Sequence, residues 1–391
     1  MAYAAATLLA AFSLQPGCTG NLCGGEALAP LLERLEQGQG VHILQLGDSH
    51  TAGDMITQPL RAALQARWGK GGRGVLPPGR PYPGYLTWGV TAFQSGPWRV
   101  GSLTRGGTVG LSGYTQSVAA AGASLGVTGD DEANRFDRIT VCALTGPEAG
   151  TVTLRIGERR QDWPLAAAAP GAECRSIEST ETASAASITT VDARRVSITS
   201  FATFRKAGGV ALSNLGVSGS QLVHQGRQAD AIVRAELQAY APDLVILAFG
   251  TNEGFTPRFD AIAYERDLRA QVARIRRLAA RDVPILILGA PDAATRNAAL
   301  ANNAGPGTPC GGGGYVPSAL AAVRDVQRRT ARDLRLAYRD WHAAMGGTCA
   351  SVRWAARGLM RGDLVHFTRA GGEAIGRALF HDLTRRSLAR P

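Results

Sequence analysis

Two patterns of apolar and polar residues alternate near both ends of the chain. Almost uninterrupted apolar runs occur at residues 41–47 (VHILQLG), 242–250 (PDLVILAFG), 283–291 (VPILILGAP) and 335–341 (RLAYRDW). Such runs are typical of parallel strands that are buried on both faces. Stretches with apolar residues at helical spacing accompany them, over residues 57–69, 264–282, 319–334 and 370–388. This alternation of strands and helices predicts an α/β sandwich with a parallel sheet.

The middle of the chain, from about residue 93 to residue 209, has a different pattern. Short apolar or alternating stretches such as 136–144 (FDRITVCAL) and 150–157 (GTVTLRIG) are separated by turn-forming residues. Residues 176–190 (SIESTETASAASITT) are polar and favour a turn-rich or edge region. We therefore predict that residues 93–209 form a β-rich domain inserted between the first and second strands of the α/β domain. The α/β domain then consists of residues 1–92 and 210–391.

The first apolar run leads into the stretch LQLGDSHTAGD (residues 44–54), which contains a candidate nucleophile. A strand followed by Gly-Asp-Ser places Ser49 at the carboxyl end of the sheet, where open α/β folds bind ligands. Backbone amides at the start of the following helix can stabilise an oxyanion there. A serine that only caps the helix would give the same local pattern, so this stretch alone leaves both interpretations open.

Three further stretches supply the partners that a nucleophilic serine needs. In RGDLVHFTRAGG (residues 361–372), Asp363 and His366 are three residues apart, so one turn of chain can place the carboxylate against the imidazole. Gly219, in the loop NLGVSGSQL, can offer an unhindered backbone N–H. Asn252 follows a buried strand and carries an amide donor. Together these residues predict a catalytic triad and an oxyanion hole.

The four stretches contain the sequence blocks GDSH, GVSGS, GTNE and DLVH, in that order along the chain. With these four blocks the chain resembles the SGNH (GDSL-type) hydrolase superfamily. The resemblance implies a three-layer α/β/α sandwich, with Ser49 as nucleophile, His366 as general base and Asp363 as the group that orients it. It also implies an oxyanion hole formed by Gly219, Asn252 and the Ser49 amide, and neither a metal nor a cofactor. One departure is visible: the third block commonly ends in Asp, whereas this chain has Glu253.

Longer stretches resemble the peptidoglycan O-acetylesterases of Gram-negative bacteria. They are GDSHTAGD, GKGGRGVLPP, RDWHAAMGG and DLVHFTRAGG. That group carries an inserted β-sandwich similar to a carbohydrate-binding module, and 170 positions separate Ser49 from Gly219 here. The resemblance implies an esterase that removes acetyl groups from peptidoglycan or from an acetylated exopolysaccharide such as modified cellulose. A polysaccharide O-acetyltransferase with the same triad, and a non-catalytic polysaccharide-binding protein, remain as alternatives.

The charge of the chain changes this picture little. The formal net charge is +11. The sequence has two lysines, Lys70 and Lys206, so almost all of the positive charge comes from arginines, which are scattered through predicted helices. We interpret them as solvated faces and expect no nucleic-acid partner, with a mild preference for anionic polymers of the cell envelope. No apolar run reaches the roughly 18 residues of a membrane-spanning helix, so no stable membrane insertion is expected. The oligomeric state stays open.

The six cysteines suggest an exported protein, in the periplasm or secreted. Their even number is compatible with three disulfides, which persist in oxidising compartments. Pairing of neighbours in order would join Cys18 to Cys23, Cys142 to Cys174 and Cys310 to Cys349, although six cysteines allow fifteen pairings. The N-terminal stretch MAYAAATLLAAFSLQPGC is apolar but lacks a preceding basic residue. We interpret it as an incomplete leader, with an amphipathic helix as the alternative.

Overall fold

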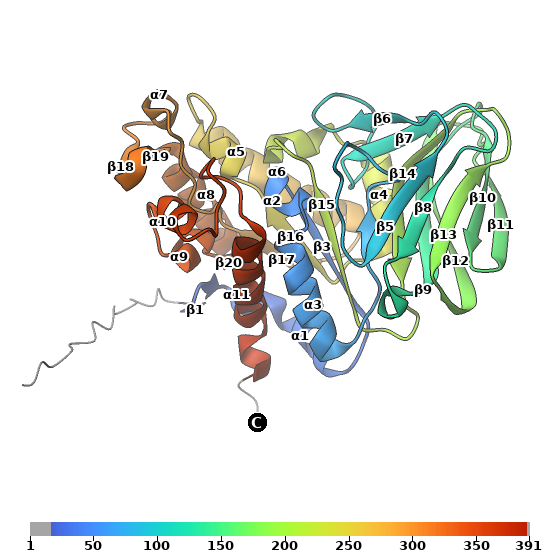
Figure 1. Ribbon diagram of the computed structural model, residues 1–391, viewed down its shortest axis with the longest axis horizontal. Helices are drawn as coiled ribbons and strands as arrows, with labels where there is room; N and C mark the ends of the chain where they lie inside the picture. The colour runs from blue at the N-terminus through green and yellow to red at the C-terminus, as the bar shows by residue number, and fades with distance from the viewer. Residues whose placement is uncertain (1–16, 389–391) are drawn as a thin grey trace, which may run out of the picture.

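The centre of the hydrolase-like half is a seven-stranded sheet with the strand order β1-β2-β20-β17-β16-β3-β15 (Figure 1). The computed structural model describes residues 17–388, and side chains up to residue 385, so the predicted leader stretch lies largely outside the described residues. Five strands are parallel, namely β15 (Val210–Gly216), β3 (Val41–Gly47), β16 (Leu244–Ala248), β17 (Ile285–Leu288) and β20 (Ala337–Arg339). The short strands β1 (Cys18–Thr19) and β2 (Leu22–Cys23) extend the sheet in antiparallel fashion.

Successive residues of each strand point to opposite sides of the sheet, and both sets are mostly apolar and buried. Helices therefore cover both faces of the sheet. In β3, Ile43 packs in the layer of α1, α3 and α11, whereas Leu44 packs in the layer of α4, α6 and α8. The first layer comprises α1 (Ala29–Glu36), α3 (Thr57–Trp68) and α11 (Arg369–Leu388), and the second α4 (Asp230–Tyr240), α6 (Ala261–Ala279) and α8 (Ala319–Asp333). The three-layer α/β/α sandwich predicted from the sequence is therefore confirmed.

Shorter elements complete this half of the molecule. They are η1 (Gly25–Leu28), α2 (Ser49–Ala52), η3 (Leu222–Arg227), α5 (Thr251–Gly254), α7 (Ala298–Ala301), β18 (Thr308–Cys310), η4 (Gly311–Gly313), β19 (Gly314–Val316), α9 (Trp341–Met345) and α10 (Ala350–Ala356). The strand predicted over 335–341 is confined to three residues, Ala337–Arg339. Asp340 ends it, because its side chain accepts the N–H of Ala343 and so caps α9.

Two antiparallel sheets pack face to face in the β-rich part of the chain (Figure 1). One contains β5 (Val90–Ser95), β8 (Ser124–Gly129), β13 (Ala185–Thr190), β10 (Thr151–Ile156) and β11 (Arg159–Pro164). The other contains β6 (Arg99–Ser102), β7 (Tyr114–Val118), β14 (Val196–Phe204), β9 (Phe136–Thr145) and β12 (Gly171–Ala183), with β4 (Gly74–Leu76) paired to β14 and η2 (Glu132–Asn134) in a connection. Apolar residues from both sheets, such as Leu154 and Val141, form the core between them.

All these strands lie between β3 and β15 in chain order, so a β-rich insertion after the first strand of the parallel sheet is present as predicted. The boundaries at residues 93 and 209 remain a prediction, and the first of them falls within β5 (Val90–Ser95). The polar segment 176–190 is not turn-rich: it contributes the end of β12 and all of β13. Its Ser and Thr residues fit strands, since β12 is the edge of its sheet and is largely open to solvent.

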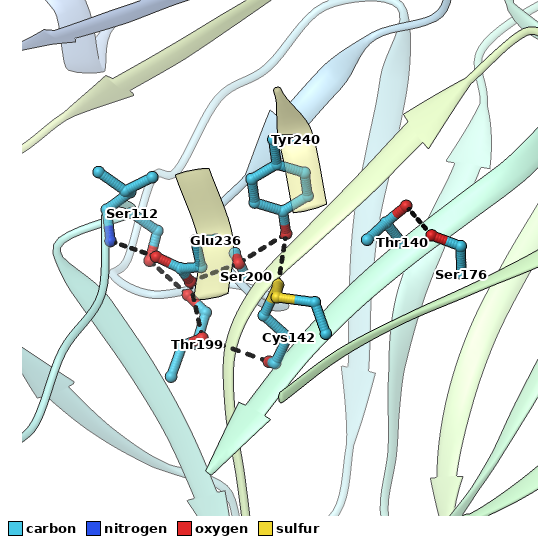
Figure 2. The surroundings of a disulfide bond; sticks show 10 residues. Ser112, Thr140, Cys142, Ser176, Thr199, Ser200, Glu236 and Tyr240 are labelled. Carbon is cyan, nitrogen blue, oxygen red and sulfur yellow. Dashed lines mark hydrogen bonds between the residues drawn. A yellow bond between two sulfur atoms is a disulfide. The ribbon is translucent and has the colours of Figure 1, made fainter. Parts of the chain in front are cut away.

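The sandwich and the α/β half share a buried junction. Residues of β9 alternate, so that Val141 faces the sandwich core while Cys142 packs with residues of α4. Within this junction the Glu236 carboxylate of α4 accepts hydrogen bonds from the Leu111 N–H at 2.5 Å and from the Ser200 hydroxyl at 2.6 Å (Figure 2). The Thr199 hydroxyl is a third donor, at 2.7 Å. Burial raises the pKa of Glu236, although these three hydrogen bonds oppose the shift.

The cysteines form three disulfides, Cys18–Cys23, Cys142–Cys174 and Cys310–Cys349. The suggested pairing of neighbours in order is therefore confirmed. Cys142 and Cys174 lie opposite each other on β9 and β12, beside the Tyr240 hydroxyl, which is 3.3 Å from the Cys142 sulfur. Among the described residues, no helix has the length and apolar character needed to cross a membrane.

Candidate active site

Ser49 is the first residue of α2, directly beyond the carboxyl end of β3. The strand ends at Gly47, where a Cβ atom would collide with the Thr51 side chain and lie 2.8 Å from the Ala248 carbonyl oxygen. Only glycine lets α2 pack this closely over the sheet. The Asp48 carboxylate accepts the His50 N–H at 2.9 Å and caps the helix, so the Ser49 side chain is not the cap. The capping alternative considered for Ser49 is therefore wrong.

The side chains of Ser49, His366 and Asp363 form one hydrogen-bonded chain. Ser49 Oγ lies 2.9 Å from Nε2 of His366, and Nδ1 of the same ring lies 2.9 Å from Oδ2 of Asp363. The other carboxylate oxygen of Asp363 accepts the backbone N–H groups of Val365 and His366, each at 2.9 Å. These bonds fix the turn that precedes α11 and orient the imidazole toward the serine.

The hydrogen bonds also set the protonation of Asp363. Partial burial acts to raise the pKa of its carboxyl, but the two backbone N–H donors and the His366 ring outweigh it, so that the pKa lies below its usual value. Asp363 is therefore an anion at neutral pH and can accept the Nδ1–H of His366. Nε2 of His366 is then free to take a proton from Ser49.

Ser49 and His366 open into a cavity of about 270 Å³. Its walls combine residues of α2 and its surroundings, such as Met55, with Phe367 and Arg361 near the histidine. A further wall comes from the segment between β4 and β5, which contributes Tyr82, Gly84 and Leu86. The cavity is small, which suits a short acyl group, and its lining mixes apolar side chains such as Met55 with polar ones such as Tyr82.

The two remaining predicted site residues lie on neighbouring loops. Gly219 is exposed with a φ of 75°, in the left-handed region that favours glycine. Asn252, in α5, donates one N–H of its side-chain amide to the Ser220 carbonyl at 2.9 Å. This bond holds the loops of the second and third sequence blocks together. The amide has a second N–H, and its role in an oxyanion hole with Gly219 and Ser49 remains a prediction.

Glu253, the residue that departs from the family pattern, connects the same two loops. Its carboxylate is buried and accepts the Leu222 N–H at 2.6 Å and the Gly250 N–H at 2.9 Å. Burial raises the pKa of Glu253 to about 7, and the two N–H donors limit the shift. The carboxylate thus supports the loops of the second and third sequence blocks.

His50 follows the nucleophile and is buried behind it. Its Nε2 lies 2.9 Å from the Val365 carbonyl oxygen, and its Nδ1 lies 3.4 Å from the Asp48 carboxylate. Burial acts to lower the pKa of His50, but Asp48 and the Val365 carbonyl outweigh it and the pKa is raised. His50 therefore links α2 to the turn that carries Asp363 and His366.

A buried ionic cluster is connected to α2 by hydrogen bonds. The sequence patterns did not predict a role for its residues. Asp54 is fully buried, with a φ of 53°, and its carboxylate contacts Arg61 at 2.7 Å and Arg73 at 3.2 Å. Arg73 also donates to the Asn214 side chain, which in turn donates to the Thr51 carbonyl at 2.9 Å. Burial acts to raise the pKa of Asp54, but the two arginines outweigh it and lower the pKa.

A signal for this cluster was present in the sequence. Asp54 and Arg73 stand in GDSHTAGD and GKGGRGVLPP, two of the stretches that carry the family resemblance. Only the fold shows that the two side chains meet under α2.

Comparisons with known proteins agree with this geometry. The model of the GDSL-like lipase/acylhydrolase family matches residues 188–374, which include the second, third and fourth blocks but not Ser49. A solved structure titled as a peptidoglycan O-acetylesterase in action has a TM-score of 0.78 and 28% sequence identity, covering 94% of this chain and 100% of that chain. A family two carbohydrate esterase from Cellvibrio japonicus has a TM-score of 0.29 and 13% identity, covering 76% of this chain and 97% of that chain.

A search of curated proteins gave no significant match. The family model nevertheless includes the sequence blocks of Gly219, Asn252 and His366, and the esterase structure matches almost the whole chain. Residues 188–374 thus match the GDSL-like lipase/acylhydrolase family, and the two comparisons together support an esterase of the SGNH type.

Proposed function

We propose that the protein removes O-acetyl groups from a bacterial polysaccharide, either peptidoglycan or an acetylated exopolysaccharide. The observation that carries this proposal is the chain of two 2.9 Å contacts from Ser49 through His366 to Asp363, at the mouth of a small cavity. The similarity over 94% of the chain to a peptidoglycan O-acetylesterase supports an acetylated carbohydrate as the substrate.

In the first half of the reaction, Ser49 Oγ attacks the acetyl carbonyl carbon and His366 Nε2 takes the hydroxyl proton. The resulting oxyanion accepts hydrogen bonds from the backbone N–H groups of Ser49 and Gly219 and from the Asn252 amide. When the tetrahedral intermediate collapses, the ester C–O bond breaks. His366 returns the proton to the sugar oxygen, so the sugar leaves as an alcohol and the acetyl group stays on Ser49.

The second half repeats this sequence with water. His366 takes a proton from the water molecule while its oxygen attacks the acetyl-serine carbonyl, and the proton then passes to Ser49 Oγ as the bond to the enzyme breaks. The products are acetate and free enzyme. Throughout, the Asp363 carboxylate accepts Nδ1–H and stabilises the imidazolium form of His366.

The three disulfides support a periplasmic or secreted location, where such polymers occur. The test of the proposed function is acetate release from acetylated peptidoglycan and from a panel of acetylated exopolysaccharides, measured beside hydrolysis of a chromogenic acetate ester. Release of acetate from a polymer, accompanied by free sugar hydroxyls, supports the proposal. Hydrolysis of the small ester without release from any carbohydrate would contradict it.

A further inference from the structure

Arg361 is held beside the catalytic histidine by the backbone. Its N–H donates to the His366 carbonyl at 2.7 Å, and its own carbonyl accepts the Leu364 N–H at 3.0 Å. The turn that positions His366 thus also positions Arg361. Among the described residues that line the cavity of Ser49, Arg361 is the sole lysine or arginine.

The guanidinium of Arg361 is exposed and, within residues 17–385, it contacts no carboxylate. The acidic residue nearest in the chain, Asp363, already accepts from Val365 and His366 with both of its oxygens. Arg369, which follows closely, differs from Arg361 because it pairs with Glu373 at 3.4 Å. Arg361 therefore brings an arginine without a carboxylate partner to the wall of the cavity of Ser49.

Beside apolar groups in the cavity lining, Arg361 provides a strong hydrogen-bond donor. Met55, Ile56, Leu86 and Phe367 line the cavity with apolar groups. A hydrogen bond between a guanidinium and a carboxylate is stronger than one between neutral groups. An arginine also presents two parallel N–H donors, which match the two oxygens of a carboxylate.

From this placement we infer that the substrate of the esterase is an acidic sugar, and that Arg361 binds its carboxylate while the O-acetyl ester lies at Ser49. The inference rests on the proposed function and makes Arg361 a determinant of substrate specificity. Two sources supply the same chemistry: the ring carboxylate of a uronic acid, and the free lactyl carboxylate of muramic acid in peptidoglycan strands that have lost their peptides.

The experiment uses matched pairs of substrates. In one pair, an O-acetylated uronate oligosaccharide is compared with the same oligosaccharide after reduction of its carboxylates to alcohols. In the other, O-acetylated glycan strands with free lactyl carboxylates are compared with strands in which these groups are amidated. Values of kcat/KM for acetate release are measured for the natural protein and for Arg361→Gln, Arg361→Lys and Arg357→Gln.

Arg357→Gln is the control. Arg357 is exposed and lies outside the cavity lining, and its substitution changes the net charge by the same amount. We expect Arg361→Gln to lower kcat/KM on the acidic member of one pair by about tenfold or more. On the neutral member and on a small acetate ester the loss in kcat/KM should be at least about fivefold smaller than on the acidic member. Arg361→Lys should restore part of the loss, since it keeps the charge but not the paired donors.

The pair that shows this selective loss identifies the source of the carboxylate. Equal losses on the acidic and neutral members, or a natural protein that prefers the neutral members, would overturn the inference and leave the proposed function intact. Absence of acetate release from every carbohydrate, with hydrolysis of the small ester retained, would instead overturn the proposed function and the inference with it.

Discussion

The backbone N–H of Leu222 donates to Oε1 of Glu253 at 2.6 Å, which joins the loop of the second sequence block to that of the third. The same carboxylate accepts the Gly250 N–H. Aspartate, the residue commonly found at this position in the family, is one methylene shorter than glutamate. In this chain the longer side chain spans both donors, so the departure from the family pattern preserves the support of the two loops.

The raised pKa of Glu253 predicts a pH dependence of stability. The pKa is about 7 in the folded protein and near 4.5 when unperturbed, so between these values the folded state binds more protons than the unfolded state. The contribution of Glu253 is therefore fully present below pH 4.5 and is lost as the pH rises through 7. The loss reaches about 3 kcal/mol at 1.36 kcal/mol per pKa unit. The check is denaturant unfolding of the natural protein and Glu253→Gln at several pH values. A difference between them that stays constant from pH 4.5 to 7.5 contradicts the prediction.

Replacement of Ser49 by alanine should abolish ester hydrolysis and leave the fold intact, because the removed hydroxyl serves the reaction and does not cap α2. Loss of a triad member typically lowers the rate by about 10⁴-fold or more. Turnover of a chromogenic acetate ester and a thermal unfolding curve measure both effects. Ser95→Ala is the control, since Ser95 is an exposed serine of β5 outside the cavity lining and its replacement should leave turnover nearly unchanged. Comparable rates for the two variants would refute the assignment of the nucleophile.

Asp54→Asn should destabilise the protein and lower kcat together. The substitution leaves Arg61 and Arg73 buried without their carboxylate, and breaking a buried ion pair in this way costs about 3–5 kcal/mol. Because the cluster supports α2 through Asn214, Ser49 should also lose its position.

Asp282→Asn is the control. It removes an exposed partner of Arg276 and should lower the free energy of unfolding by about 1 kcal/mol or less. Unfolding free energies and kcat of both variants test this, and similar values for the two would speak against a supporting role of Asp54.

Thiol titration of the denatured, unreduced protein should detect no free cysteine, since all six are paired. Reduction of Cys142–Cys174, which are 32 residues apart, should lower the free energy of unfolding by roughly 3–4 kcal/mol through the freed entropy of the unfolded chain. Melting curves with and without reductant measure the change. Several reactive thiols before reduction would contradict the pairing and weaken the case for export.

The sandwich should contribute to polymer recognition and not to the chemistry. A cavity of about 670 Å³ lies on it, lined by residues such as Arg135, Arg155 and Phe93. Arg155→Ala is expected to lower kcat/KM on an acetylated polysaccharide severalfold while leaving hydrolysis of a small acetate ester unchanged, because only the polymer uses binding energy remote from Ser49. Equal effects on both substrates would mean that this surface supports the fold alone.

The sequence predicted those features that depend on local patterns. Four of the five parallel strands and four of the six helices of the two layers follow from apolar periodicity. The contacts of Ser49, His366 and Asp363 follow from the sequence blocks that contain them. Contacts between distant polar residues were not predictable in this way. Arg73, directly before β4, meets Asp54 because β4 pairs with β14 and lies against β15, which carries Asn214, and no local pattern encodes these long-range contacts. Strand β13 was missed because its outward residues are polar and its apolar residues are few.

The Glu236 junction has a consequence for how the protein unfolds. The buried cluster around α4 includes Leu111, Cys142 and Phe204 from the β-rich segment together with Val233 and Tyr240 from the helix. Removing the segment would expose this apolar surface and leave the Glu236 carboxylate without Leu111, Thr199 and Ser200. The sandwich is thus not a module that can be exchanged among hydrolases at will. Helix α4 and the sandwich face that it covers share one buried interface, so we expect the two parts to unfold together in a single transition.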